Sequence, residues 1–127
     1  MVGIVLVSHS LALALEVANL ARALTAEKPA VFATGGAEDG SLGTSIDRLR
    51  TAVAAADQGD GVIILADIGS SVLTAKLLVE DLCADHIVLA DAPLVEGAVA
   101  AAVMAGAGAP LPDVLAAAEQ ARTTGKL

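Results

Sequence analysis

Short apolar runs alternate along the chain with longer segments that carry apolar residues at helical spacing. The short runs are rich in Val, Ile, Leu and Ala, as in strands covered on both faces, and they lie at residues 2–7, 30–33, 62–66 and 87–90. The longer segments predict helices, at residues 11–24, 45–56, from the Asp67–Ser71 turn to about 82, 93–105 and 112–120. Strands that alternate with helices predict an α/β fold, a mainly parallel sheet flanked by helices in three layers.

Residues at the segment ends support these boundaries. Gly43-Thr44-Ser45 offers N-cap chemistry for the second helix, and prolines can open the last two helices at Pro93 and Pro112. We assign Cys83 and Met104 to the apolar core. No repeat, linker or charge run divides the chain, so we expect one domain over residues 1–127.

Composition narrows the classes of partner. The chain has 127 residues, is 56% hydrophobic, and has Phe32 as its only aromatic residue. Its net charge of -8 argues against nucleic acid or an anionic membrane surface as the main partner, since both need clustered cations. A basic partner protein stays open, and the high apolar content of so small a chain suggests an oligomer.

The cysteine content and the longest apolar stretches indicate the cellular compartment of the protein and whether it forms disulfides. The single cysteine cannot form an internal disulfide and excludes a four-cysteine zinc site, which fits a reducing cytoplasm. The longest uncharged stretch, residues 97–112, is too short and too rich in Gly and Pro to span a bilayer. The first fifteen residues lack the basic start of a signal peptide. We therefore expect a cytoplasmic protein that does not insert into a membrane.

Polar residues gather where the predicted strands end. Ligands of open parallel sheets bind outside the carboxyl ends of the strands. The residues there include a histidine, two carboxylates, hydroxyls and glycines: Ser8, His9 and Ser10, then Thr34, Gly35 and Gly36, then Asp67, Gly69, Ser70 and Ser71, and finally Asp91.

His9 is the main candidate for chemistry at this edge. A neutral imidazole is a nucleophile near neutral pH, and a carboxylate such as Asp67 could fix its tautomer. The helix start at Gly69-Ser70-Ser71 supplies backbone N–H groups suited to an anion. Together these residues describe a histidine that could carry a phosphoryl group.

Plainer interpretations stay open for the same residues. His9 could cap the next helix, Asp67 could be a turn residue, the paired serines could be N-caps, and Thr34-Gly35-Gly36 could be a tight turn. The two histidines, His9 and His86, lie in different elements, so no metal site is predicted. Gly106-Ala107-Gly108 lacks the spacing of a dinucleotide-binding loop. We therefore expect no cofactor.

Four short motifs follow one another along almost the whole chain. They are VLVSHS from Val5, Gly43-Thr44-Ser45, VIILADIGSS from Val62, and APLVEG from Ala92. In this order they resemble the mannose-class IIA domains of the bacterial sugar phosphotransferase system. Among these, the resemblance is to the DhaM type, the phosphoryl-donor subunits of phosphoenolpyruvate-dependent dihydroxyacetone kinase.

The resemblance implies a phosphotransferase subunit that dimerises. His9 would accept a phosphoryl group from the carrier protein HPr and pass it to ADP on the kinase subunit, where the ATP formed phosphorylates dihydroxyacetone. Asp67 would orient His9. The residues implied to line or flank the phosphoryl site are Ser8, Ser10, Thr34, Gly35, Gly43, Thr44, Gly69, Ser70 and Ser71. The resemblance leaves open which ring nitrogen is phosphorylated.

Three alternative functions remain open, and the plainest is a small anion-binding α/β domain without phosphotransfer. A transport-type IIA domain would pass the phosphoryl group to a IIB domain, but such members tend to carry a tryptophan after the aspartate, and this chain has none. A regulatory module would use the phosphorylated histidine as a switch for binding. Some relatives continue into HPr-like and Enzyme I-like domains, and we expect separate proteins to supply those activities here.

Overall fold

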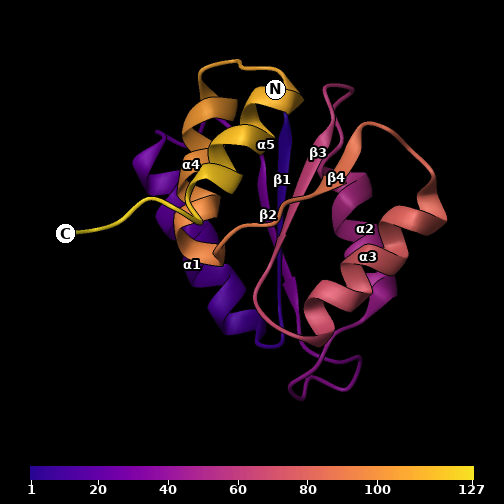
Figure 1. The fold of residues 1–127 in the computed structure, drawn as a ribbon. Coiled ribbons are helices and arrows are strands. Elements are labelled where there is room, and N and C mark those ends of the chain that lie inside the picture. The colour runs from indigo at the N-terminus through magenta and orange to yellow at the C-terminus, as the bar shows by residue number, and fades with distance from the viewer.

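A four-stranded sheet lies between two layers of helices in the computed structural model, which describes residues 1–127 (Figure 1). Strands and helices alternate until two helices close the chain: β1 Gly3–Ser8, α1 Leu11–Leu24, β2 Val31–Gly35, α2 Ile46–Ala56, β3 Val62–Ala66, α3 Ser70–Leu82, β4 Ile87–Leu89, α4 Leu94–Gly106 and α5 Leu111–Gln120. The predicted α/β fold is confirmed.

The strand order is β2-β1-β3-β4, and every neighbouring pair is parallel. The chain leaves β1 toward β2 on one side and returns to β3 on the other, so the direction of winding reverses between β1 and β3. Ligand sites of such sheets lie outside the carboxyl ends of the strands at this reversal. The fold therefore places the turns after β1 and β3, with His9 and Asp67, at the position where a site is expected.

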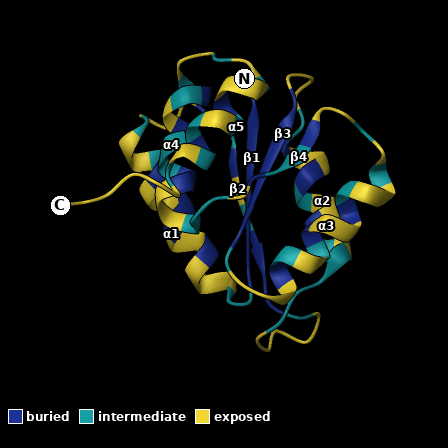
Figure 2. Cartoon of the chain, in the orientation of Figure 1, coloured by how far each residue is buried: buried dark blue, intermediate teal, exposed yellow.

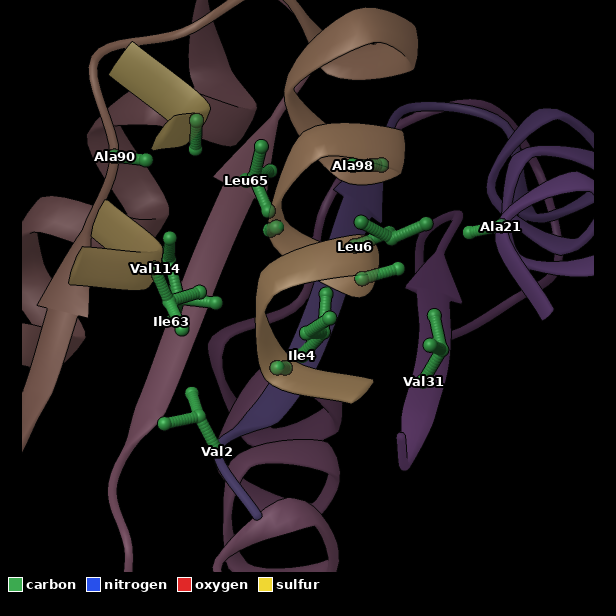
Figure 3. Close-up of a cluster of buried hydrophobic side chains, with 14 of the residues drawn as sticks. Val2, Ile4, Leu6, Ala21, Val31, Ile63, Leu65, Ala90, Ala98 and Val114 are labelled. Carbon is green, nitrogen blue, oxygen red and sulfur yellow. The ribbon is translucent and has the colours of Figure 1, made fainter. Parts of the chain in front are cut away.

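Alternate side chains of the inner strands pack on opposite faces of the sheet. Ile4 of β1 and Ile63 of β3 belong to the larger core cluster, which α1, α4 and α5 cover. Figure 3 shows α4 crossing this face, with Ala98 directed toward the strands. Several buried alanines of α4, including Ala98 and Ala101, let the helix approach the sheet closely.

The opposite face is covered by α2 and α3. Val5 of β1 and Ile64 of β3 pack there against Leu49 of α2 and Leu78 of α3. Every residue of β1 and β3 is buried, as the continuous apolar runs predict. Figure 2 shows these buried strands between helices whose outer faces are exposed. The two inner strands thus form a rigid base for the turns that follow them.

Several predicted boundaries shift by one or two residues. β2 runs through Gly35 because its ladder with β1 continues to the pair Ser8 and Gly35. β4 ends at Leu89, and α5 begins one residue before Pro112. Ser45, as predicted, is the N-cap of α2 and accepts from the Arg48 N–H.

The assignment of Cys83 to the core is wrong, because this residue is exposed. It follows the last residue of α3 with φ 48°, and this left-handed conformation turns it away from the buried helix face. Met104 is half-buried and packs against the edge of the larger cluster. None of the helices is long and apolar enough to cross a bilayer.

Candidate functional site

The turn between β1 and α1 carries His9. β1 ends at Ser8 and α1 begins at Leu11, so His9 stands between the strand and the helix cap. Ser10 is the N-cap, and its hydroxyl accepts from the Leu13 N–H at 3.3 Å. The imidazole therefore does not cap α1 and is left available for other contacts.

Asp67 is the first residue after β3 and ties its own turn to the one that carries His9. Its carboxylate accepts from the Ser8 hydroxyl at 2.8 Å, the His9 backbone N–H at 3.1 Å and the Ile68 N–H at 2.7 Å. The bonds from Ser8 and His9 join residues about sixty positions apart along the chain. They fix the backbone on both sides of the imidazole, which is more than a simple turn residue would do.

Each nitrogen of the His9 ring has a different partner. Nδ1 lies 3.1 Å from Asp67 Oδ1 and 3.3 Å from Oδ2, and the Ser71 hydroxyl oxygen is 3.1 Å from the same nitrogen. Nε2 lies 2.6 Å from the Ser70 hydroxyl oxygen. An ionised carboxylate only accepts, so Nδ1 carries the proton and donates it to Asp67. In the neutral ring, Nε2 then holds the free electron pair and accepts from Ser70.

The electrostatics of Asp67 support this assignment. Burial alone would raise the pKa of the Asp67 carboxyl, but hydrogen bonds from the Ser71 hydroxyl, the Ile68 N–H, the Ser8 hydroxyl and the His9 N–H outweigh it. The net effect holds the pKa of Asp67 well below its ordinary value. The carboxylate is therefore a fixed negative charge beside Nδ1 throughout the physiological pH range.

The start of α3 borders the Nε2 side of the ring. Gly69 is the N-cap with φ 46° and makes no side-chain cap bond, so the alternative that the serines serve only as N-caps does not hold. The hydroxyls of Ser70 and Ser71 contact His9 instead. The N–H groups of Ser71 and Val72 donate to the carbonyls of Ile68 and Gly69, both at 3.1 Å, which leaves the Ser70 N–H without a backbone acceptor at the positive end of the helix dipole. This end of α3 can therefore receive an anion next to Nε2.

Glycines let the neighbouring backbone come close to His9. A Cβ at Gly35 would lie 2.5 Å from the Ser8 carbonyl oxygen and 3.1 Å from the Leu11 nitrogen, so only glycine fits there without a shift. The Gly43 N–H donates to the His9 carbonyl at 3.1 Å, and Gly43 has φ 148°. The loop at residues 36–44 is thereby held against the turn that carries the imidazole.

Two predicted lining residues lie apart from the ring. Thr34 is buried on β2 and lines a hollow beside α2 together with Arg48, Glu38 and Asp47. The hydroxyl oxygen of Thr44 lies 2.9 Å from that of Thr74, so it connects the 36–44 loop to α3. Their place in the structure indicates support of the loop and sheet edge. Sequence reasoning grouped them with the site because they follow strands or precede a helix.

Sequence reasoning missed Arg48. A cavity of about 210 Å³ is lined by His9, Arg48 and residues of the 36–44 loop and the α1 start. The signal was available: Arg48 falls in the first turn of α2, where the helix dipole disfavours a cation.

No group of three His, Cys, Asp or Glu side chains lies close enough together to hold a metal ion.

Comparison with known proteins agrees with this geometry. A family model described as "EIIA-man: PTS system fructose IIA component" matches residues 3–115. The phosphotransferase subunit DhaM of a PTS-dependent dihydroxyacetone kinase from Lactococcus lactis is 35% identical, over 84% of this chain and 85% of its own length. A phosphoryl donor subunit DhaM from Providencia stuartii is 32% identical over 95% of this chain.

The chain spans only 27% of the length of the Providencia relative. Among solved structures, the protein EF1359, described as of unknown function, superposes with a TM-score of 0.82 at 32% identity and covers 100% of both chains. The family match spans the site residues from His9 to Asp67, and a relative of comparable length is aligned over most of both chains. The chain therefore belongs to the EIIA-man family of the phosphotransferase system, as a IIA domain of the DhaM type.

Proposed function

We propose that residues 1–127 act as one phosphocarrier domain in which His9 accepts a phosphoryl group from HPr and passes it to ADP on the kinase subunit of a dihydroxyacetone kinase. The names of the DhaM relatives support the phosphoryl-donor role. One observation carries the proposal: His9 is held by Asp67 at Nδ1, while the hydrogen-bond partner of Nε2 is the Ser70 hydroxyl.

The geometry supports Nε2 as the accepting atom. With its proton on Nδ1, the ring presents the electron pair of Nε2 to an incoming phosphorus atom. The Nε2–P bond forms as the bond from phosphorus to the donor's histidine nitrogen breaks, and that nitrogen recovers the electron pair. The ring becomes an imidazolium, whose positive charge Asp67 stabilises through the Nδ1 proton.

The setting of the site also suits a carrier that serves two partners in turn. The His9 side chain is 29% exposed, so Nε2 lies near the surface. Large apolar residues stand exposed in the adjoining segments, with Leu42 at 77% and Ile68 at 70%. Such residues provide apolar area for a docking protein.

Delivery to ADP then reverses the first step: the Nε2–P bond breaks as a terminal phosphate oxygen of ADP attacks phosphorus.

Intact-mass analysis at mildly alkaline pH tests this proposal. The protein is mixed with phosphoenolpyruvate, Enzyme I and HPr, alongside His9→Ala and His86→Ala. His86 is a matched control, because it pairs with Asp57 at the other end of the sheet. We expect an acid-labile phosphate adduct on the wild type and on His86→Ala, and none on His9→Ala.

The second stage adds the ADP-loaded kinase subunit with dihydroxyacetone. Loss of the adduct with formation of dihydroxyacetone phosphate is the expected result. An adduct that persists would contradict delivery to the kinase and favour a transport-type or regulatory role. Absence of any adduct would overturn the phosphocarrier role itself. The homodimer implied by the family stays a prediction, which light scattering on the same sample checks.

A further inference from the structure

Arg48 is a half-buried cation without a carboxylate partner. It forms no salt bridge, although Arg50 on the same helix pairs with Asp81 at 2.8 Å. Its guanidinium donates only to backbone carbonyls, to Glu38 at 3.2 Å and to Gly35 at 3.5 Å. A guanidinium has five N–H groups, so donors remain free for another acceptor.

The cavity that Arg48 shares with His9 contains no acidic side chain. The chain has 15 Asp and Glu residues against 7 Lys and Arg, yet none of the acidic residues lines this cavity and Arg48 is its only Lys or Arg. Its other walls are the α1 start at Ser10, Leu11 and Ala12 and the glycine-rich 36–44 loop. The first N–H groups of α1 lack acceptors within the helix. None of these walls places a carboxylate in the cavity lining, although Asp39 of the same loop lies close enough to Arg48 to interact with it electrostatically.

The position of Arg48 opposes helix stability. In the first turn of α2 the helix dipole disfavours a positive charge by roughly 0.3–1 kcal/mol. Its two contacts, at 3.2 and 3.5 Å, are long for charge-assisted hydrogen bonds. Backbone contacts of this kind do not require a full cation. The remaining guanidinium N–H groups could instead donate to an anion in the adjoining cavity.

We propose that Arg48 binds the phosphoryl group during its transfer to Nε2 of His9, from the cavity that the two residues share. This inference rests on the proposed phosphocarrier function and adds the residue that compensates the charge of the phosphoryl oxygens. Arg48 takes no part in proton transfer. It contacts equatorial oxygens while the bond to the donor nitrogen breaks and the Nε2–P bond forms, where charge compensation accelerates phosphoryl transfer.

A small chemical donor separates this role from protein docking. Phosphoramidate transfers its phosphoryl group to histidine: the Nε2 electron pair bonds to phosphorus, the P–N bond breaks, and ammonia leaves. Rates of His9 phosphorylation by phosphoramidate and by phosphorylated HPr are measured by intact mass for the wild type, Arg48→Gln, Arg48→Lys and the control Arg50→Gln. Circular dichroism and thermal unfolding establish that each variant is folded.

We expect Arg48→Gln to be phosphorylated about tenfold or more slowly by both donors, since a hydrogen bond to a charged group is lost. Arg48→Lys should recover most of the rate, and Arg50→Gln should match the wild type. When the concentration of phosphorylated HPr is varied, Arg48→Gln should lower the maximal rate of His9 phosphorylation more than it changes the HPr concentration for half-maximal rate.

Each other outcome rejects the inference in a distinguishable way. Equal rates for all folded variants would reject phosphoryl binding by Arg48 and leave the proposed function intact. A loss with HPr but not with phosphoramidate would show a docking role for Arg48 instead. An equal loss in Arg48→Lys and Arg48→Gln, with altered thermal unfolding, would show that Arg48 only holds the 36–44 loop. If the wild type accepts from neither donor, the proposed function fails together with the inference.

Discussion

The hydroxyl oxygen of Ser70 lies 2.6 Å from Nε2 of His9, on the side of the ring that phosphorus would approach in the proposed transfer. The hydroxyl rotates freely about one bond, so it can move from the ring nitrogen to a phosphoryl oxygen without rearrangement of the backbone. Ser70 therefore orients the empty ring and can afterwards donate to the bound phosphoryl group. The same residue can serve both states because its backbone is fixed at the start of α3.

Ser70→Ala should slow phosphorylation of His9 by roughly tenfold without preventing it, since one hydrogen bond to a charged phosphoryl oxygen is lost. Nε2 keeps its electron pair, because Asp67 still holds the Nδ1 proton. Timed intact-mass measurements with phosphorylated HPr give the rate. Thr123→Ala removes a hydroxyl near the C-terminus, bonded to the Gln120 carbonyl, and should have no effect. An unchanged rate in Ser70→Ala would contradict a donor role for the hydroxyl.

Asp67→Asn should reduce phosphorylation of His9 far more, by about a hundredfold or greater. The amide keeps the shape of the side chain but lacks the negative charge that stabilises the imidazolium. It also has only one accepting oxygen in place of two. The bonds from Ser8, His9 and Ile68 cannot all be kept, so the free energy of unfolding should also fall, by roughly 1–3 kcal/mol. Urea unfolding and the phosphorylation assay on one sample measure both effects. A rate close to that of the wild type would rule out Asp67 as the orienting group.

The lowered pKa of Asp67 predicts how stability depends on pH. The folded protein holds this carboxyl below its unfolded pKa of about 3.9, so the ionised group stabilises the fold above that pH. The contribution disappears as pH falls from about 4 through the lower folded pKa. The difference in unfolding free energy between the wild type and Asp67→Asn should therefore be largest near pH 7 and shrink below pH 4. A difference that stays constant between pH 7 and pH 3 would contradict this linkage.

The hydrophobic pattern along the chain was sufficient to predict the fold, because the inner strands are continuous apolar runs. The apolar runs at 2–7 and 62–66 are buried on both faces, which forces helices onto both sides of the sheet. The strand ends then fix the neighbourhood of His9 and Asp67, because carboxyl ends of adjacent parallel strands share one edge. Thus the central pair of the site could be predicted from two turns.

The remaining parts of the site depend on contacts that a single sequence does not reveal. Arg48 reaches the His9 cavity only because α2 begins beside the 36–44 loop, and Thr34 points elsewhere because β2 continues two residues further than its apolar run. Cys83 follows an apolar helical pattern, but the backbone turns left-handed at that residue. Side-chain direction at the end of an element is set by its last hydrogen bonds, which periodicity does not encode.

Gly35→Ala should destabilise the protein and displace the turn that carries His9. The added Cβ would lie 2.5 Å from the Ser8 carbonyl oxygen, and backbone atoms cannot move aside as a flexible side chain could. Overpacking of this kind costs about 1–3 kcal/mol. Gly106→Ala in α4 is the control, because its Cβ would meet the nearest atom at 3.5 Å, and alanine favours a helix. Thermal unfolding should thus separate the two variants, and equal stability would show that the β1–α1 turn tolerates a shift.

Leu42→Ser and Ile68→Ser should weaken transfer from HPr, and Ile68→Ser, which lies outside the His9 cavity, should leave chemical phosphorylation intact. Both side chains are exposed beside the site, at 77% and 70%, so the fold loses little when they become polar. If they contact HPr, each loss of buried apolar area should raise the HPr concentration for half-maximal rate by about fivefold, equivalent to roughly 1 kcal/mol. Phosphoramidate, which needs no docking surface, should phosphorylate Ile68→Ser at the wild-type rate. Leu24→Ser at the far end of α1, where the leucine is 59% exposed, should change neither reaction. Equal HPr dependence in all three variants would place the docking surface away from Leu42 and Ile68.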